Sequence, residues 1–444
     1  MNAEIRQIKT AAEQGLVDAF ASAKQTLPGA GSVAALRARA FSDFESCGLP
    51  HRRVEEWKYT DLRAFMREAK PLAVPPDATA KARARRAGEW LAAVDARRIF
   101  IVDGVFAADL SDLAGLEKGL SIEPLSRALA SGKADHVNPL GAPLAMSGDP
   151  ALALNTAFMG DGALIRVEAG AAIERPIHIL YVAAGNTAAA MFTRSVVVVG
   201  SRAQVTLIED HAGPDGLDYQ VNHALELAIG DEAQVDHIKI NREGDKALHL
   251  ATSLSAVGAR AKVNDFSFHI GGAVVRNQIA ARFDGEGIEA NVRGASLLKN
   301  RQHVDNTMVI DHAVPHCTGR ELFKAVLDGE SRAVFQGKII VRQDAQKTDG
   351  KMASHALLLS EDAEIDHKPE LEIFADDVVC GHGATAGSLD DDLLFYLRAR
   401  GIPRKEAEAL MIQAFIGEAV EGIANEALRD ALMGEVERWL AARV

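Results

Sequence analysis

Short segments in which apolar and polar residues alternate follow one another from about residue 160, and a recurring turn separates them. The turn has the form Gly-x-x-Ala-x-Val and begins at residues 200, 230 and 258, with looser copies at residues 170, 285, 329 and 360. Such a near-constant interval indicates that each repeat forms one level of a stack whose neighbouring levels share a core. We expect Gly to permit a tight or left-handed turn, Ala to pack inward at a corner, and Val to begin the next inward face.

The segments between these turns have the length and composition of β-strands. Examples are residues 194–199, 205–210, 234–240, 262–268 and 337–341. They are too short and too closely spaced to leave room for crossover helices. The pattern therefore predicts a mainly β protein whose core is a right-handed parallel β-helix, or solenoid. An antiparallel β-sandwich is the structural alternative.

Helical patterns flank this core. Residues 1 to about 70 read as helices, Ser32 can cap the second of them, residues 98–106 read as a strand, a turn and a strand, and residues 111–158 read as loops and short helices. We divide the chain into an N-terminal helical and mixed region (1–158), a β-helix core (159–387) and a C-terminal helical domain (388–444). Because a solenoid needs covered ends, we expect the flanking regions to cap it.

The C-terminal domain begins with a helix that Ser388 opens and Gly401 ends, and Pro403 starts the next helix. The apolar arc of this second helix is wider than a one-sided surface helix needs; it comprises Leu410, Met411, Ile412, Phe415, Ile416 and Val420. We expect one side of this helix to cap the solenoid and the other to meet a partner. A purely intramolecular core is the alternative.

Composition narrows the classes of function. The chain has 444 residues, a formal net charge of −13 and 5% aromatic residues, which argues against a nucleic-acid or anionic-membrane surface and against a groove that stacks bases or sugars. Three cysteines form no disulfide framework, and the sequence shows neither an export signal nor a membrane-spanning run. We therefore expect a reducing, cytoplasmic location. Without a phosphate-binding Gly-x-x-x-x-Gly-Lys-Ser/Thr loop, the chain should not itself hydrolyse ATP.

The strongest candidate for chemistry is the pair Cys380 and His382. On a strand, residues two apart leave the same face, so the two side chains would point together. A thiolate and a neutral imidazole are ligands for iron, zinc and iron–sulfur centres. Two ligands make half of a four-ligand site, which a second chain or a transient cluster would complete. The alternative is that Cys380 is a small buried apolar residue and His382 a hydrogen-bonded turn residue.

Other candidates are weaker. His312, His316 and Cys317 lie close in sequence to His303 and Asp305, and this group suggests either a metal or proton-relay site or side chains that satisfy turns in the solenoid. Residues 57–60 alternate aromatic and polar side chains, and we expect Trp57 to be a packing anchor rather than a ligand platform.

Several motifs together resemble the SufB/SufD family, the scaffold subunits of the SUF iron–sulfur cluster assembly system. They are Asp376-Asp-Val-Val-Cys-Gly-His-Gly-Ala-Thr-Ala-Gly387, Leu393-Leu-Phe-Tyr-Leu-Arg-Ala-Arg-Gly401, Ala345-Gln-Lys-Thr-Asp-Gly350, Leu357-Leu-Leu-Ser360, Lys368-Pro-Glu-Leu-Glu-Ile373 and Phe323-Lys-Ala-Val-Leu-Asp-Gly329. Glu55-Glu-Trp-Lys-Tyr-Thr60 and the short N-terminal region are more similar to the SufD branch than to the SufB branch. Gly381 departs from the family, which often has serine there.

The resemblance implies a β-helix fold and a non-catalytic scaffold role. It implies a partner that is a SufB-like paralogue or a second copy of the chain, a SufC-type ABC ATPase docked on the C-terminal helices, and a transient iron–sulfur cluster shared with the partner chain. The docking candidates are Leu393, Phe395, Leu410 and Phe415. Reduced flavin as an electron source for the complex is left open, as is the type of cluster.

Two other classes of function remain as alternatives. The first is a purely structural β-helix homodimer in which Cys380 and His382 are incidental. The second is a β-helix enzyme acting on polysaccharide, which the acidic, aromatic-poor sequence disfavours.

Overall fold

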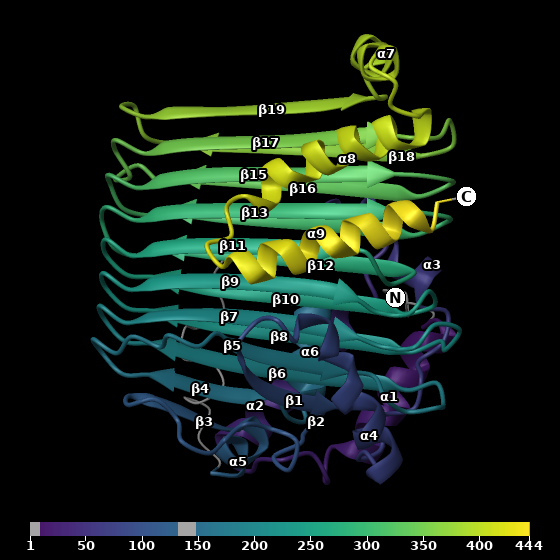
Figure 1. Cartoon of the computed structure of the whole chain (residues 1–444). Helices are drawn as coiled ribbons and strands as arrows, with labels where there is room; N and C mark the ends of the chain where they lie inside the picture. Colours follow the sequence, from purple (N-terminus) through teal and green to yellow (C-terminus); the bar gives the residue numbers. More distant parts are fainter. Residues whose placement is uncertain (1–8, 132–147, 444) are drawn as a thin grey trace, which may run out of the picture.

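The computed structural model describes residues 9–131 and 148–443, and its core is a parallel β-solenoid built from two facing sheets (Figure 1). The ten-stranded sheet runs in the order β19-β17-β15-β13-β11-β9-β7-β5-β1-β2, and the nine-stranded sheet in the order β18-β16-β14-β12-β10-β8-β6-β4-β3. The chain alternates between the two sheets, so each turn of the solenoid adds one strand to each. All pairings are parallel except β1 with β2 and β3 with β4, which confirms the solenoid over the sandwich.

The strands of the ten-stranded sheet are β1 (Arg97–Val102), β2 (Val105–Phe106), β5 (Ile177–Val182), β7 (Gln204–Ala212), β9 (Gln234–Arg242), β11 (Lys262–His269), β13 (Glu289–Leu298), β15 (Thr318–Leu327), β17 (Asp349–Leu358) and β19 (Val379–Gly387). Those of the nine-stranded sheet are β3 (Leu120–Pro124), β4 (Ala163–Val167), β6 (Ala190–Val199), β8 (Gln220–Ile229), β10 (Leu248–Val257), β12 (Val274–Phe283), β14 (His303–His312), β16 (Arg332–Val341) and β18 (Glu364–Ile373). Both sheets thus extend before residue 159, through β1, β2 and β3.

The recurring turn forms a corner of the solenoid. Its alanines, Ala203, Ala233 and Ala261, are fully buried, which confirms that they pack inward. The left-handed residue, however, is the one before each alanine, with φ of 58° at Arg202, 59° at Glu232 and 55° at Arg260.

Glycine is needed at these corners for space. Of the two roles expected for it, a tight or a left-handed turn, the left-handed one is wrong for the three full copies. A Cβ at Gly200 would lie 2.4 Å from the backbone nitrogen of Ala169, and one at Gly230 would lie 2.6 Å from that of Ser201. Both contacts are with the backbone of the preceding level, where no side chain can move aside. The glycines therefore set the close stacking of successive corners.

The N-terminal region contributes α1 (Ala11–Ala23), α2 (Ser32–Cys47), η1 (Glu55–Trp57), α3 (Leu62–Phe65), α4 (Ala78–Ala87), η2 (Glu89–Leu91), α5 (Leu125–Ala130) and α6 (Pro150–Phe158). Helices α1, α2 and α6 share an aromatic core of Phe20, Phe41, Phe44 and Phe158. Gly31 occupies the N-cap of α2, so Ser32 begins that helix instead of capping it. Parts of the expected first helix and of 111–158 lie outside the described residues.

The C-terminal helices are α7 (Asp391–Ala399), α8 (Arg404–Val420) and α9 (Glu426–Ala441). Asp390 caps α7, where we had expected Ser388 to open the helix. Helices α8 and α9 lie across the outer face of the ten-stranded sheet, where Ile412, Ile416 and Trp439 pack against outward residues such as Ile238 and Phe268 (Figure 1). They therefore cover a side of the solenoid and leave its last strands bare, which corrects our expectation of a cap. None of the helices in 9–131 and 148–443 is long and apolar enough to cross a membrane.

Candidate functional site

The solenoid ends on two bare strands, β18 and β19. Each stands last in its sheet, so within the described residues the outer edge of neither strand pairs with another strand. Most side chains of β19 are exposed, and Ile373, Phe374 and Val379 are 41%, 59% and 62% exposed. An open sheet edge with exposed apolar side chains favours pairing with another chain.

Cys380 and His382 lie on this terminal strand. In the register of β17 and β19, Cys380 is opposite Gly350 and His382 is opposite Met352, which belongs to the solenoid core. Both candidate ligands therefore take the inward-facing parity of the strand. Cys380 is half-buried against the core, whereas His382 is exposed because no further level covers it.

The Cys380 thiol is protonated near neutral pH. Burial raises its pKa above 9.0, the charges of Asp349 and Glu321 add to the increase, and a backbone hydrogen bond with Gly350 opposes it. A metal ion must therefore displace the thiol proton before sulfur can bind it. His382 lies two residues further along the same face of β19, where its imidazole can serve as a second ligand.

The weaker candidates do not come together as a ligand set. His316 is an exposed turn residue with φ of 62°, and Cys317 is buried in the solenoid core. His312 is also buried, and its ring packs edge-on against Phe283 with 4.6 Å between ring centroids. Among the described residues, none of the three belongs to a group of three or more potential metal ligands within 4.8 Å.

Two other expectations concern the early motif. Trp57 is buried, and the Arg276 guanidinium lies 4.1 Å from its ring centroid, which confirms Trp57 as a packing anchor. Thr60 Oγ1 lies 2.9 Å from His303 Nε2 and also donates a hydrogen bond to Asp305. His303 and Asp305 thus fasten the N-terminal region to the nine-stranded sheet.

The docking candidates divide into exposed and packed residues. Leu393 and Phe395 on α7 are 46% and 74% exposed, and Leu410 on α8 is 43% exposed. Phe415 is partly buried in the core beneath α8, with Lys324 Nζ 4.4 Å from its ring centroid. The first three therefore remain candidates for contact with a partner, while Phe415 anchors the helix to the sheet.

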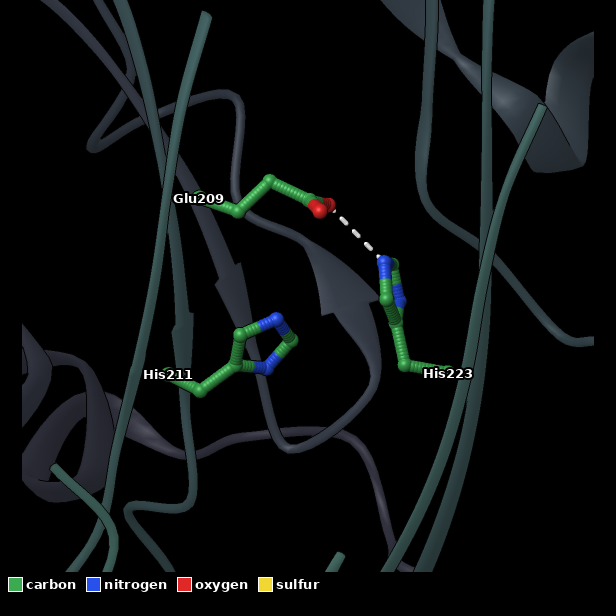
Figure 2. Close-up of side chains that lie close together, drawn as sticks. All are labelled: Glu209, His211 and His223. Carbon is green, nitrogen blue, oxygen red and sulfur yellow. Dashed lines mark hydrogen bonds and ion pairs between the residues drawn. The ribbon is translucent and has the colours of Figure 1, made fainter. Parts of the chain in front are cut away.

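Sequence analysis missed a polar cluster inside the solenoid. Glu209 and His211 point inward from β7, and His223 points inward from β8 on the facing sheet (Figure 2). Their ligand atoms all lie within 4.8 Å of one another, and all three side chains are buried. The alternation of side chains along the strand could have revealed it. Glu209 and His211 fall on the same face as Val205 and Leu207, which belong to the core.

Burial sets the charge states of the histidines in this cluster. It lowers the pKa of His211 well below 6.5 and lowers that of His223 as well, so both are neutral. His237 is different: burial opposes its protonation, but the carboxylates of Asp265 and Glu209 outweigh burial and raise its pKa to about 10. The interior therefore contains a charged carboxylate–imidazolium–carboxylate chain beside two neutral imidazoles.

Comparison with known proteins agrees with this architecture. Residues 181–415 match the model of the SUF system FeS cluster assembly SufBD core domain, and residues 10–179 match that of the SufBD N-terminal region. An iron–sulfur cluster assembly SufBD family protein of Synechocystis is 31% identical over 87% of this chain and 86% of its own. The iron–sulfur cluster assembly protein SufD of Escherichia coli is 29% identical over 88% of this chain and 90% of its own. The chain therefore belongs to the SufBD family of iron–sulfur cluster assembly proteins.

Proposed function

We propose that this chain is a non-catalytic scaffold subunit of a cytoplasmic SUF complex and that it pairs with a SufB-like chain through its open end. The observation that carries the proposal is the bare terminal strand, which presents Cys380 and His382 at an unpaired sheet edge. A partner solenoid that continues the sheets would satisfy the free backbone groups of β18 and β19. It would also cover the exposed Ile373, Phe374 and Val379.

The cargo of this junction is a nascent iron–sulfur cluster. In the proposal, His382 acts as a ligand or proton acceptor and Cys380 supplies a thiolate once its proton has left. Because clusters commonly take four protein ligands, the partner chain provides the remainder. A site divided between two chains forms only when they associate, and it can release its cluster when they separate.

A SufC-type ATPase is the second partner in this proposal, docked on the face formed by α7 and the start of α8. Leu393, Phe395 and Leu410 are large apolar side chains that are 46%, 74% and 43% exposed there. Exchanging Phe395 for Ser should abolish co-purification of the ATPase and leave stability within about 0.5 kcal/mol of wild type. Exchanging Phe415 for Ala should instead destabilise the chain by roughly 1–3 kcal/mol.

The main test is anaerobic cluster assembly by the purified complex. His382→Ala should abolish cluster formation, read by visible absorbance and by acid-labile sulfide, without changing the composition of the complex. Exchange of the exposed His316 for Ala is a matched control and should leave assembly unchanged. The site assignment is wrong if complexes carrying His382→Ala form clusters at the normal rate. Isolation of a homodimer alone, with no paralogous chain bound in the native cell extract, would favour the structural-homodimer alternative.

A further inference from the structure

We propose that the interior of the solenoid holds a resident divalent transition-metal ion, bound by Glu209, His211 and His223. This inference rests on the buried cluster alone and does not depend on the proposed function of the open end. Two imidazoles and a carboxylate are a ligand set typical of Fe²⁺ and Zn²⁺.

The geometry of the three side chains suits a single ion. Their ligand atoms lie within 4.8 Å of one another. An ion with bonds of about 2.0–2.2 Å draws such ligands slightly closer together, which small side-chain rotations accomplish. Figure 2 shows the carboxylate of Glu209 and the ring of His223 directed at one another from opposite sheets, with the ring of His211 beside them.

His211 is the observation that most directly indicates a ligand. Its side chain is fully buried, yet neither of its ring nitrogens has a hydrogen-bond partner among the described residues. A buried polar atom without a partner is costly, and a bound ion or water at the site accounts for it. The ring stacks on Tyr181, with 4.6 Å between centroids and 6° between planes, which holds its orientation.

The other two ligands are supported by a second layer of hydrogen bonds. His223 Nδ1 lies 2.9 Å from Thr193 Oγ1, and a hydrogen bond donated there leaves Nε2, the nitrogen that faces Glu209, with a lone pair for the ion. Glu209 Oε2 lies 3.1 Å from His237 Nε2, and His237 Nδ1 lies 2.7 Å from Asp265 Oδ2. This arrangement of carboxylate and histidine partners is common behind metal ligands, where it fixes their orientation.

A neighbouring group competes for the assignment. Among the described residues, His211, Glu243 and His249 also have ligand atoms within 4.8 Å. His249 Nδ1 lies 2.8 Å from Glu243 Oε2, but neither ring nitrogen of His249 makes a hydrogen bond with acceptable geometry. His223 has a hydrogen-bond partner, Thr193, that orients its ring, and His249 has none among the described residues. We therefore assign the ion to Glu209, His211 and His223.

Charge also favours a cation here. Glu209, Glu243 and Asp265 are buried in this part of the interior together with two cations. One is the His237 imidazolium, and the other is Lys239, whose Nζ donates a hydrogen bond to Asn277 Oδ1 at 3.1 Å. The three carboxylates outnumber these two cations by one, and a bound metal cation offsets that excess. Since the three ligands are at most 1% exposed, the ion should exchange slowly and be acquired during folding.

The experiment uses the full chain, unfolded with chelator and refolded anaerobically with Co²⁺ or Fe²⁺. After desalting, the wild type should retain a single ion by elemental analysis, show a Co²⁺ d–d absorption band, and melt at a higher temperature than chain refolded without metal. Glu209→Gln and His211→Phe each remove a ligand, so both variants should fail to retain the ion after desalting and should lose the rise in melting temperature. Phe at position 211 keeps an aromatic ring stacked on Tyr181.

Two matched controls complete the test. Glu243→Gln should retain the ion, and so should the double variant Cys380→Ser, His382→Ala, which removes only the candidate ligands at the open end. Circular dichroism of each metal-free variant verifies its fold. The inference is overturned if the wild type retains no ion, if Glu209→Gln retains it fully, or if the ion is lost from the double variant alone.

Discussion

Met352 and His382 occupy the same register position on adjacent strands, yet Met352 is 2% exposed and His382 is exposed. The two positions differ in the level above them. β19 covers β17, and within the described residues nothing covers β19. What would be a core position one turn earlier is thus presented at a surface, and the first prediction follows from this difference.

Thiol labelling should report the covering of the open end. In the isolated chain we expect iodoacetamide to modify Cys47, which is exposed, and Cys380, which is half-buried, but not the buried Cys317. Because burial raises the pKa of the Cys380 thiol above 9.0, its labelling rate should still climb as the pH passes 9. Binding of a SufB-like chain should protect Cys380 and leave Cys47 reactive, as measured by mass spectrometry. Equal labelling of Cys380 in a verified complex would place the junction elsewhere.

The attachment of the N-terminal region should depend strongly on Arg276. This buried residue donates hydrogen bonds to Asp305 and, at 2.7 Å, to the carbonyl of Glu56, and it stacks on Trp57. Arg276→Met leaves the buried Asp305 carboxylate without its cationic partner, so we expect a loss of about 3–5 kcal/mol in the free energy of unfolding in urea.

The control for this variant is Arg282→Met on the same strand. Arg282 pairs with Asp284, and both side chains are more than one-third exposed, so the loss should be about 0–1 kcal/mol. Similar losses from the two variants would contradict a special role for the buried pair.

The corner glycines should tolerate no side chain. Gly230→Ala places a Cβ 2.6 Å from the backbone nitrogen of Ser201. We therefore expect the free energy of unfolding to fall by about 1–3 kcal/mol and the melting temperature to fall with it. Gly381→Ala adds a methyl group where nothing lies within 4 Å, so stability should stay within about 0.5 kcal/mol of wild type. If Gly230→Ala leaves the free energy of unfolding unchanged, the levels of the solenoid can move apart at this corner.

Glu321 should make stability fall as the pH rises. Burial raises its pKa to about 8 from 4.5, with Arg320 opposing the increase. An acid whose pKa is higher in the folded chain contributes its full stabilisation below the unfolded value and loses it as the pH rises through the folded one. We therefore expect the wild type to lose up to a few kcal/mol between about pH 4.5 and 8 through this group.

Glu321→Gln, which stays neutral, should be more stable than the wild type in urea at pH 8.5 and similar to it near pH 4.5. Glu289→Gln on the neighbouring strand is the control, because that side chain is 61% exposed and should leave the pH dependence unaltered. If the free energy of unfolding depends on pH in the same way for the wild type and for Glu321→Gln, then Glu321 is hydrated or has a polar partner in the folded chain.

Periodicity was sufficient to predict the solenoid, because the buried alanines at residues 203, 233 and 261 repeat at nearly equal spacing. Periodicity could not explain why glycine occupies the same turns, since the close approach between levels involves residues about 30 positions earlier in the chain. It also could not place α8 and α9, because an apolar helix face packs equally well against the side of a stack or its end.

The candidate site shows a similar division. Spacing alone predicted that Cys380 and His382 share a face, and the strand β19 has that geometry. The interior cluster was missed because inward positions were assumed to be apolar, although Glu209 and His211 already stood at such positions in the sequence. Their proximity to His223 depends on the pairing of facing sheets, which a single sequence does not specify.

The bare strand β19 has a consequence for how cells must produce this protein. Its unpaired backbone can template any extended segment of suitable register, including the same strand of an identical molecule. In the proposed assembly with a SufB-like chain, the supply of that chain during synthesis governs how many copies of this protein enter the complex and how many self-associate. Coordinated, stoichiometric production of the two chains is the simplest safeguard that such an architecture demands.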